Sequence, residues 1–390
     1  ELTDPVNGSI QIRNKYQFIS LDGFEASWSL TENGKEIDNG AIRMRPSWGR
    51  GLFSANIPYK IEHPKAGAEY FLRISYKQKE KTLWADKGFE VASAQFKLPV
   101  NTPPVIETKV TSPVKLVQNA QSAVVSGKDF SVSFNKKTGF ISQLIKNGTN
   151  LLTADGGPQL HLWRAGHRTD DDWAFRQWEK FGVTTLKYTL VDFKAETVDN
   201  ASVQITSTTK ADGTAIYLVK GDGSIVVDNK VEFVGLRINL AKIGVRMMLD
   251  KKLDRMTFFG CGPFENYSDR KAAAEVGLYE IGVYEQYTYE KPMERGNHED
   301  VRWAKLSGKD MPSLLVESDA KLMQVAALPH TDEQMYPVEY KIDLPASSAP
   351  VLSVSTKTLG VGSNSCGPQP LERFKVSAEN TSFAYTIKLF

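Results

Sequence analysis

The sequence lacks several features that mark common protein classes. It has only two cysteines, Cys261 and Cys366, which excludes a disulfide framework, and their spacing is not that of a zinc site. Its apolar runs are far shorter than the roughly 20 residues of a membrane-spanning helix. A net charge of +2 with interspersed signs offers no basic field for nucleic acid. We therefore expect neither a membrane nor a nucleic acid as partner.

The start of the chain lacks a targeting signal. The first ten residues, ELTDPVNGSI, are typical neither of a signal peptide nor of a transit peptide, and instead read like the start of a strand. We interpret the chain as a piece of a longer protein, and the cellular compartment stays open. Its 390 residues are enough for two or three soluble domains.

Residues 1–98 alternate between apolar and polar positions with a period of two, between frequent turn signals. Asn33-Gly34 is typical of a tight hairpin turn. This pattern predicts an immunoglobulin-like β-sandwich. Residues 99–113 follow with four prolines, which remove ladder donors and restrict the backbone, so we expect an extended linker there.

Residues 114–390 return to strand patterns, with corners at Thr138-Gly139 and Asn147-Gly148. Nearly pure β sequence of this length without internal repeats predicts a large two-layer sandwich. The segment WAFRQWEKFG predicts one helix, with Trp173, Trp178 and Phe181 on its buried side and Gly182 at its end.

The polar segment at residues 162–178 contains Asp170, Asp171 and Asp172 directly before this helix. Acidic residues there are typical of helix capping. The alternatives are a polar loop over a sugar site, or a site for a hard cation, which would need further ligands.

The segment GCGPFENYSDR, which ends at Arg270, places six polar side chains after a Gly-Pro break. Glu265, Asp269 and Arg270 could satisfy one another as an ion-paired corner, or could present oxygens to a ligand. Carboxylates four residues apart on one irregular segment can hardly flank a glycosidic bond from opposite directions. We therefore favour a structural role.

Two further polar segments follow. In GNHEDVRW, His298 and Glu299 resemble an acid/base couple, but neighbouring residues of a strand point to opposite faces, so we do not expect them to cooperate. In TLGVGSNSCGPQP, the glycines surround Asn364 and Cys366 but no helix follows, which excludes a phosphate-binding loop.

Together and in this order, these segments resemble the C-terminal portion of the large β-galactosidases of glycoside hydrolase family two. The most specific of them is the run from Gly262 to Arg270. The resemblance implies the family's second immunoglobulin-like domain at residues 1–98 and, at 114–390, the β-supersandwich that the family shares with galactose mutarotases.

The resemblance also implies what this chain does not contain. The two catalytic glutamates and the Mg²⁺ ligands of the family lie on a preceding (β/α)₈ barrel, and residues 1–390 show no such repeat. We therefore assign no catalytic residue or cofactor to this segment and leave metal binding open. We expect the chain alone to be inactive, with the barrel, a β-galactoside and further subunits as partners of the parent enzyme.

In the family, a glycine-rich loop of this domain contributes an aromatic ring that stacks on the substrate. Cys366 stands at the matching position, and a thiol offers no ring face. A mobile loop of the family begins at the position of Arg164, and Gly166 stands where members commonly have proline, which would loosen it. The residues expected to bind substrate are Cys366, Asn364, Arg164, Asp170 and His298. The residues expected at a structural rim are Glu265, Asn266, Tyr267, Asp269, Arg270, Arg302 and Trp303.

Two alternatives remain open from the sequence. Aromatic residues and polar rims on a β-sandwich also fit a stand-alone carbohydrate-binding module. A less favoured alternative is a mutarotase-like epimerase that uses His298 as acid and a carboxylate as base.

Overall fold

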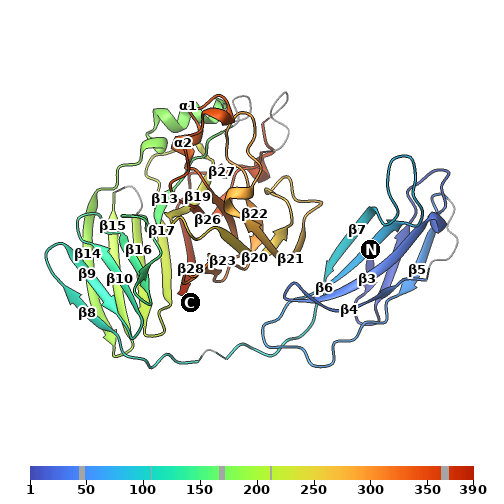
Figure 1. Cartoon of the computed structure of the whole chain (residues 1–390), viewed down its shortest axis with the longest axis horizontal. Coiled ribbons are helices and arrows are strands. Elements are labelled where there is room, and N and C mark those ends of the chain that lie inside the picture. Colours follow the sequence, from blue (N-terminus) through green and yellow to red (C-terminus); the bar gives the residue numbers. More distant parts are fainter. Residues whose placement is uncertain (44–48, 107, 167–171, 211–212, 362–368) are drawn as a thin grey trace. The chain divides into compact units, whose positions relative to one another are not determined.

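The structure is a computed structural model that describes residues 1–43, 49–106, 108–166, 172–210, 213–361 and 369–390. The chain forms two compact units, which we call the N-terminal unit (Glu1–Thr108 and Glu275–Leu278) and the C-terminal unit (Lys109–Ala274 and Tyr279–Phe390). Both are built almost entirely of strands (Figure 1). The prediction of an all-β protein is therefore confirmed.

The N-terminal unit has seven described strands in two sheets, as in immunoglobulin-like sandwiches. One sheet has the order β1-β2-β5 and the other has the order β4-β3-β6-β7. The strands are β1 (Leu2–Asp4), β2 (Ser9–Arg13), β3 (Phe24–Glu32), β4 (Lys35–Ala41), β5 (Leu52–Asn56), β6 (Tyr70–Gln78) and β7 (Glu90–Lys97).

Period-two alternation directs the side chains of β3 into the core. Phe24, Ala26, Trp28 and Leu30 are buried while the residues between them are more exposed. The predicted turn at Asn33-Gly34 joins β3 to β4, and both of its residues have positive φ, as a tight hairpin requires.

A buried tyrosine closes the corner of the N-terminal unit at the start of β6. The Tyr70 hydroxyl accepts a hydrogen bond of 3.0 Å from the backbone N–H of Lys65 and donates one of 2.7 Å to Glu32. A tyrosine that bonds back to the backbone just upstream is a recurrent feature of immunoglobulin-like sandwiches. It ties the incoming loop to the sheet.

The C-terminal unit contains three larger antiparallel sheets and one two-stranded pair, β18-β27. The five-stranded sheet β12-β11-β10-β9-β8 consists of β8 (Lys115–Gln118), β9 (Ser122–Ser126), β10 (Phe130–Asn135), β11 (Ile141–Lys146) and β12 (Thr149–Asn150). A second five-stranded sheet has the order β13-β19-β26-β25-β22. Its strands are β13 (Gln159–His161), β19 (Lys242–Met248), β22 (His298–Val301), β25 (Met323–Leu328) and β26 (Val351–Thr358).

The nine-stranded sheet is the largest element of the C-terminal unit, with the order β14-β15-β16-β17-β28-β24-β23-β20-β21. Its strands are β14 (Leu190–Asp199), β15 (Ser202–Thr209), β16 (Gly213–Lys220), β17 (Ile225–Val231), β20 (Arg255–Gly262), β21 (Glu275–Gly282), β23 (Trp303–Ser307), β24 (Leu314–Ser318) and β28 (Thr381–Leu389). The remaining elements are β18 (Asn239–Leu240), β27 (Val376–Ser377), α1 (Asp172–Lys180), α2 (Asp332–Met335) and short 3₁₀ turns at Leu21–Gly23, Val183–Thr185, Val283–Glu285, Lys341–Asp343 and Glu372–Phe374.

The inner faces of these sheets share one apolar core. Alternate residues of β15 and β17, such as Val203, Ile205, Ile225 and Val227, are fully buried in it. The corners are the predicted ones: Gly139 has a positive φ, and so do both residues of Asn147-Gly148. The core therefore follows from the same period-two pattern that predicted the strands.

The predicted helix is present as α1, and Trp178 is buried as expected, with its indole N–H donating to the Asn239 carbonyl. The prediction for Phe181 is wrong, because its side chain is 51% exposed. The helix ends at Lys180 and Gly182 turns the chain with φ +70°, so Phe181 lies beyond the last helical turn. Phe175 is buried instead, stacked on Tyr336.

We expect Tyr70→Phe to lower the free energy of unfolding of the N-terminal unit by about 2 kcal/mol. The substitution leaves the ring packed but removes a hydrogen bond to a carboxylate and leaves the Lys65 N–H without its acceptor. Urea denaturation would measure the change. Tyr16→Phe, which removes the hydroxyl of a partly exposed tyrosine in the same unit, is the control. Equal stability of the two variants would contradict the corner's role.

Candidate functional site

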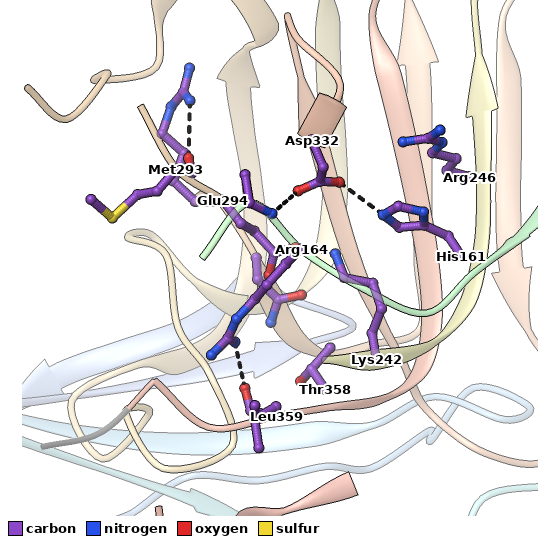
Figure 2. A network of polar contacts seen from close by, with 12 residues as sticks. His161, Arg164, Lys242, Arg246, Met293, Glu294, Asp332, Thr358 and Leu359 are labelled. Atoms are coloured by element: carbon purple, nitrogen blue, oxygen red, sulfur yellow. Dashed lines mark hydrogen bonds and ion pairs between the residues drawn. The ribbon is translucent and has the colours of Figure 1, made fainter. Parts of the chain in front are cut away.

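Four ionisable side chains meet in the interior of the C-terminal unit (Figure 2). We call His161, Lys242, Glu294 and Asp332 the buried charge cluster. His161 ends β13, Lys242 begins β19 and Asp332 begins α2, while Glu294 lies in the connection before β22. Strand ends and a helix start thus bring together residues that are far apart in the sequence.

Two contacts join the members of the buried charge cluster in pairs. Lys242 Nζ forms an ion pair with Glu294 Oε2, and His161 Nε2 lies 2.8 Å from Asp332 Oδ2. An ionised carboxylate only accepts hydrogen bonds, so the histidine donates through Nε2–H. Pairing is required because an isolated charge in a protein interior costs several kcal/mol.

The Asp332 carboxylate also holds a neighbouring segment. Its Oδ1 accepts a hydrogen bond of 2.5 Å from the backbone N–H of Ala165. Thr331 caps α2 through a capping box with Gln334, which sets Asp332 in the first helical turn. Asp332 therefore joins the start of α2, the end of β13 and the segment around Ala165.

Burial and neighbouring charge set the protonation states in the buried charge cluster. Burial, followed by the nearby Arg246 guanidinium, lowers the pKa of His161 to about 4. Burial opposes ionisation of Asp332, but the hydrogen bond from His161, the Lys242 charge and the Ala165 N–H hold its pKa well below the usual range. Burial raises the pKa of Glu294 although Lys242 opposes the shift. Because its pKa is about 4, the His161 imidazole is neutral at pH 7.

Arg164, expected at the substrate, lies buried beside this cluster (Figure 2). Its guanidinium donates hydrogen bonds of 2.8 Å to the Leu359 carbonyl and 3.1 Å to the Gly360 carbonyl. These acceptors directly follow β26, at the beginning of the glycine-rich segment. Arg164 thus holds that segment through its backbone, and a contact with substrate stays a prediction.

Asn266 is the central residue of the run from Gly262 to Arg270 and is fully buried. Its side-chain amide donates to the carbonyls of Cys261 and Phe264, each at 2.9 Å, and its Oδ1 accepts from the Glu299 N–H at 2.8 Å. Its backbone exchanges hydrogen bonds with Asn297. The run is therefore tied to the beginning of β22.

The charged residues of the same run divide between two partners. Glu265 forms an ion pair with Arg270, in agreement with the expected corner. Asp269 instead accepts a hydrogen bond of 3.1 Å from the backbone N–H of Val361. Tyr267 is buried, and the Arg270 guanidinium lies over its ring. Arg164 and Asp269 thus hold consecutive residues, Leu359 to Val361, from two different segments.

The residues around β22 bind separate partners. His298 Nδ1 lies 3.0 Å from the Cys261 carbonyl, to which it donates, and burial lowers the pKa of this imidazole to about 4. The Glu299 carboxylate accepts hydrogen bonds from Thr358 and Asn297. Burial raises the pKa of Glu299. The two neighbours therefore serve different contacts.

Arg302 and Trp303 lie where β22 leads into β23. The Arg302 guanidinium lies over the Phe259 ring and donates to the Asp300 carbonyl at 2.6 Å. Trp303 pairs with Phe259 on one side and Glu317 on the other in the nine-stranded sheet. These contacts join neighbouring strands.

Three of the predicted substrate-binding residues, Asp170, Asn364 and Cys366, lie outside the described residues, and so does Asp171. Cys261 is buried, and burial raises the pKa of its thiol to about 12, which disfavours the reactive thiolate. Within the described ranges, no group of three or more histidine, cysteine or acidic side chains could hold a metal ion. None of the described helices is both long and apolar enough to cross a membrane.

Sequence reasoning missed the buried charge cluster. One local signal was present: His161 and Lys242 interrupt apolar runs, in LHLW and LAKIGV, where a charged side chain needs a buried partner. The partners, Asp332 and Glu294, carry no comparable signal.

Comparison with known proteins shows that both units match domains described as parts of β-galactosidases. The family described as "Beta galactosidase small chain" matches residues 126–389, and "Beta-galactosidase, domain 4" matches residues 10–99. A β-galactosidase from Priestia megaterium is 28% identical over 92% of this chain and 35% of its own length. One from Kluyveromyces lactis is 22% identical over 98% of this chain and 36% of its own length. The chain thus spans about a third of these relatives.

Among solved structures, a galactose 1-epimerase from Lactobacillus acidophilus aligns with a TM-score of 0.38 and 10% identity. The alignment covers 72% of this chain and 99% of that one.

We expect Lys242→Met to destabilise the C-terminal unit by about 3–5 kcal/mol, because it leaves Glu294 buried without its partner. The double variant Lys242→Met/Glu294→Leu should recover most of this loss. Chemical denaturation of the single and double variants would measure the coupling. Arg255→Met, which breaks an exposed pair with Glu285, is the control and should change little. Additive losses in the double variant would contradict a coupled pair.

We expect the stability of the C-terminal unit to fall as the pH decreases from about 6.5 to 4. The folded-state pKa of His298 lies below that of the unfolded chain, so only the unfolded chain takes up the proton in this window. His298→Gln should reduce the slope of stability against pH by about 1.4 kcal/mol per unit. Val316→Ala, a core change without a titrating group, should keep the slope. An unchanged slope in His298→Gln would refute the assignment.

Proposed function

This chain belongs to the β-galactosidase small-chain family, and from that membership we propose that it is the C-terminal part of a retaining β-galactosidase. The observation that carries the proposal is that both units match β-galactosidase domains in the family's order, while the chain spans about a third of its relatives. The remaining two thirds would contain the (β/α)₈ barrel. Substrate would therefore be a terminal β-D-galactoside bound mainly by the barrel.

The chemistry would belong to the barrel. A retaining glycosidase needs two carboxyl groups about 5–5.5 Å apart, one as nucleophile and one as acid/base, on either side of the scissile bond. In the described part of this chain the buried carboxylates are engaged: Glu294 pairs with Lys242, Asp332 with His161, and Glu299 accepts from Thr358. These contacts suit a supporting domain and leave the reaction to the barrel's glutamates.

The contribution of this part would be to support the barrel and complete one wall of the sugar site. Arg164 and Asp269 hold Leu359 to Val361 by their backbone groups, just before Asn364 and Cys366. Because Leu359 to Val361 are held from two sides, the part of the glycine-rich segment that follows them would present Cys366 toward the substrate. Because a thiol lacks the ring face of the family's aromatic residue, the parent enzyme would prefer other leaving groups than enzymes with that ring.

The parent enzyme would use Mg²⁺, which binds through oxygen ligands. The family resemblance would place the ligands of this ion on the barrel. Assembly of the complete enzyme into a homo-oligomer is part of the same proposal.

An epimerase that uses His298 as acid is disfavoured. The pKa of His298 is lowered to about 4, so little imidazolium exists at pH 7. Its Nδ1–H is already donated to the Cys261 carbonyl.

We expect the isolated chain to hydrolyse a chromogenic β-galactoside no faster than buffer, because the reactive carboxylates belong to the barrel. The complete parent enzyme, assayed under the same conditions, should be active. A third sample, the parent truncated before residue 1 of this chain, should lose most of its activity if the two units support the barrel. Turnover by the isolated chain well above background would refute the division of labour.

A further inference from the structure

A pocket of about 250 Å³ lies on the C-terminal unit, and its described lining comes from that unit alone. Its walls include Glu265, Gln286, Tyr287, Tyr289, Arg295 and His298. We call it the Glu265 pocket. It is smaller than the roughly 300–1,000 Å³ of sites for drug-sized ligands, so its size suits a single small ring.

The carboxylate of Glu265 is held in place at the wall of this pocket. Its Oε1 accepts hydrogen bonds from Tyr289 and Arg270, and its Oε2 accepts one of 2.7 Å from the backbone N–H of Gly296. Burial opposes its ionisation, but these donors lower the pKa of Glu265, which is ionised at pH 7. A fixed carboxylate with spare lone pairs is a preorganised acceptor.

Arg295 is among the residues that line the same pocket, and it is only 2% exposed. Its Nη2 donates to Thr288 at 3.0 Å, and its Nη1 lies 3.4 Å from Met335 Sδ and 3.5 Å from the Met293 carbonyl. Among the described residues, its buried Nε has no hydrogen-bond partner, and no carboxylate lies within ion-pair distance of the guanidinium. A buried guanidinium left in this state is costly for the fold alone.

His298 contributes an acceptor. Because Nδ1–H donates to the Cys261 carbonyl, the neutral ring keeps a lone pair on Nε2. No described residue donates to Nε2, and the side chain forms part of the pocket wall. The ring is held from the other side by Phe258, with 4.1 Å between the centroids.

Two tyrosines complete the pocket. Tyr287 is 67% exposed and packs edge-on against Tyr289, with 5.6 Å between the ring centroids. The Lys341 ammonium lies over the Tyr287 ring, 5.6 Å from its centroid. Because Tyr289 is held by Glu265, it braces the exposed ring. An aromatic side chain with a held neighbour offers contact area at low entropic cost.

We propose that the Glu265 pocket binds a hexopyranose, with Tyr287 against the apolar face of the ring and Arg295, His298 and Glu265 at its hydroxyls. A polyhydroxylated ring needs donors and acceptors side by side, and the pocket has both. This site goes beyond the β-galactosidase proposal, because it uses only residues of the C-terminal unit.

Titration calorimetry of the 390-residue chain with methyl β-D-galactopyranoside should give saturable binding in the millimolar range, as expected for so small a ligand. Tyr287→Ala should weaken binding by about two- to tenfold. Trp84→Ala, which removes an exposed aromatic from the N-terminal unit, is the matched control and should bind like the unaltered chain. Absence of saturation, or equal affinity in Tyr287→Ala, would overturn the proposal.

Arg295→Met separates binding from folding. If the guanidinium serves the ligand, the variant should bind about tenfold more weakly while its Tm stays equal or rises, because an apolar side chain suits the buried position. A lower Tm with unchanged affinity would assign Arg295 to the fold and overturn its part in the site. Since no hydrolysis is measured, failure here leaves the β-galactosidase proposal standing, and the reverse also holds.

Discussion

Mutual neutralisation of buried charges is the constraint on which the interior of the C-terminal unit depends. Lys242 and Glu294 can occupy the interior only together, since either one alone would be an uncompensated charge. Asp332 extends the arrangement by accepting from both His161 and the Ala165 backbone. The end of β13, the start of β19, the start of α2 and the connection before β22 must therefore all be in place for these contacts to form. The contacts thereby fix the positions of these elements relative to one another.

The run from Gly262 to Arg270 is fixed in position by a second set of buried hydrogen bonds, centred on Asn266. Asn266 bonds to backbone groups on both sides of itself and on β22, so the run has one position relative to that strand. From that position Glu265 lies on one pocket wall and Asp269 reaches the residues after β26. A segment that resembles an active site in its composition thus acts mainly by placing two carboxylates in different surroundings.

The sequence patterns predicted those features that depend on residues close together in the chain. Turns at Asn33-Gly34 and Asn147-Gly148 follow from backbone preferences, and the pairing of Glu265 with Arg270 lies within one short segment. Phe181 was misplaced because a one-residue difference in the end of α1 changes which side chains face the core. The partners of Lys242 and Asp269 lie 52 and 92 residues away. Only the tertiary fold brings each residue to its partner. Periodicity and motif spacing therefore contain no signal for which residues pair.

The contacts that hold Leu359 to Val361 go to main-chain atoms: Arg164 binds two carbonyls and Asp269 binds one amide. Every amino acid except proline offers both groups. A substitution of Leu359, or of Val361 by anything but proline, therefore leaves the hydrogen-bonding groups in place. The anchorage of this segment thus depends on the side chains of Arg164 and Asp269, and those of Leu359 and Val361 can change without touching the hydrogen bonds that hold them.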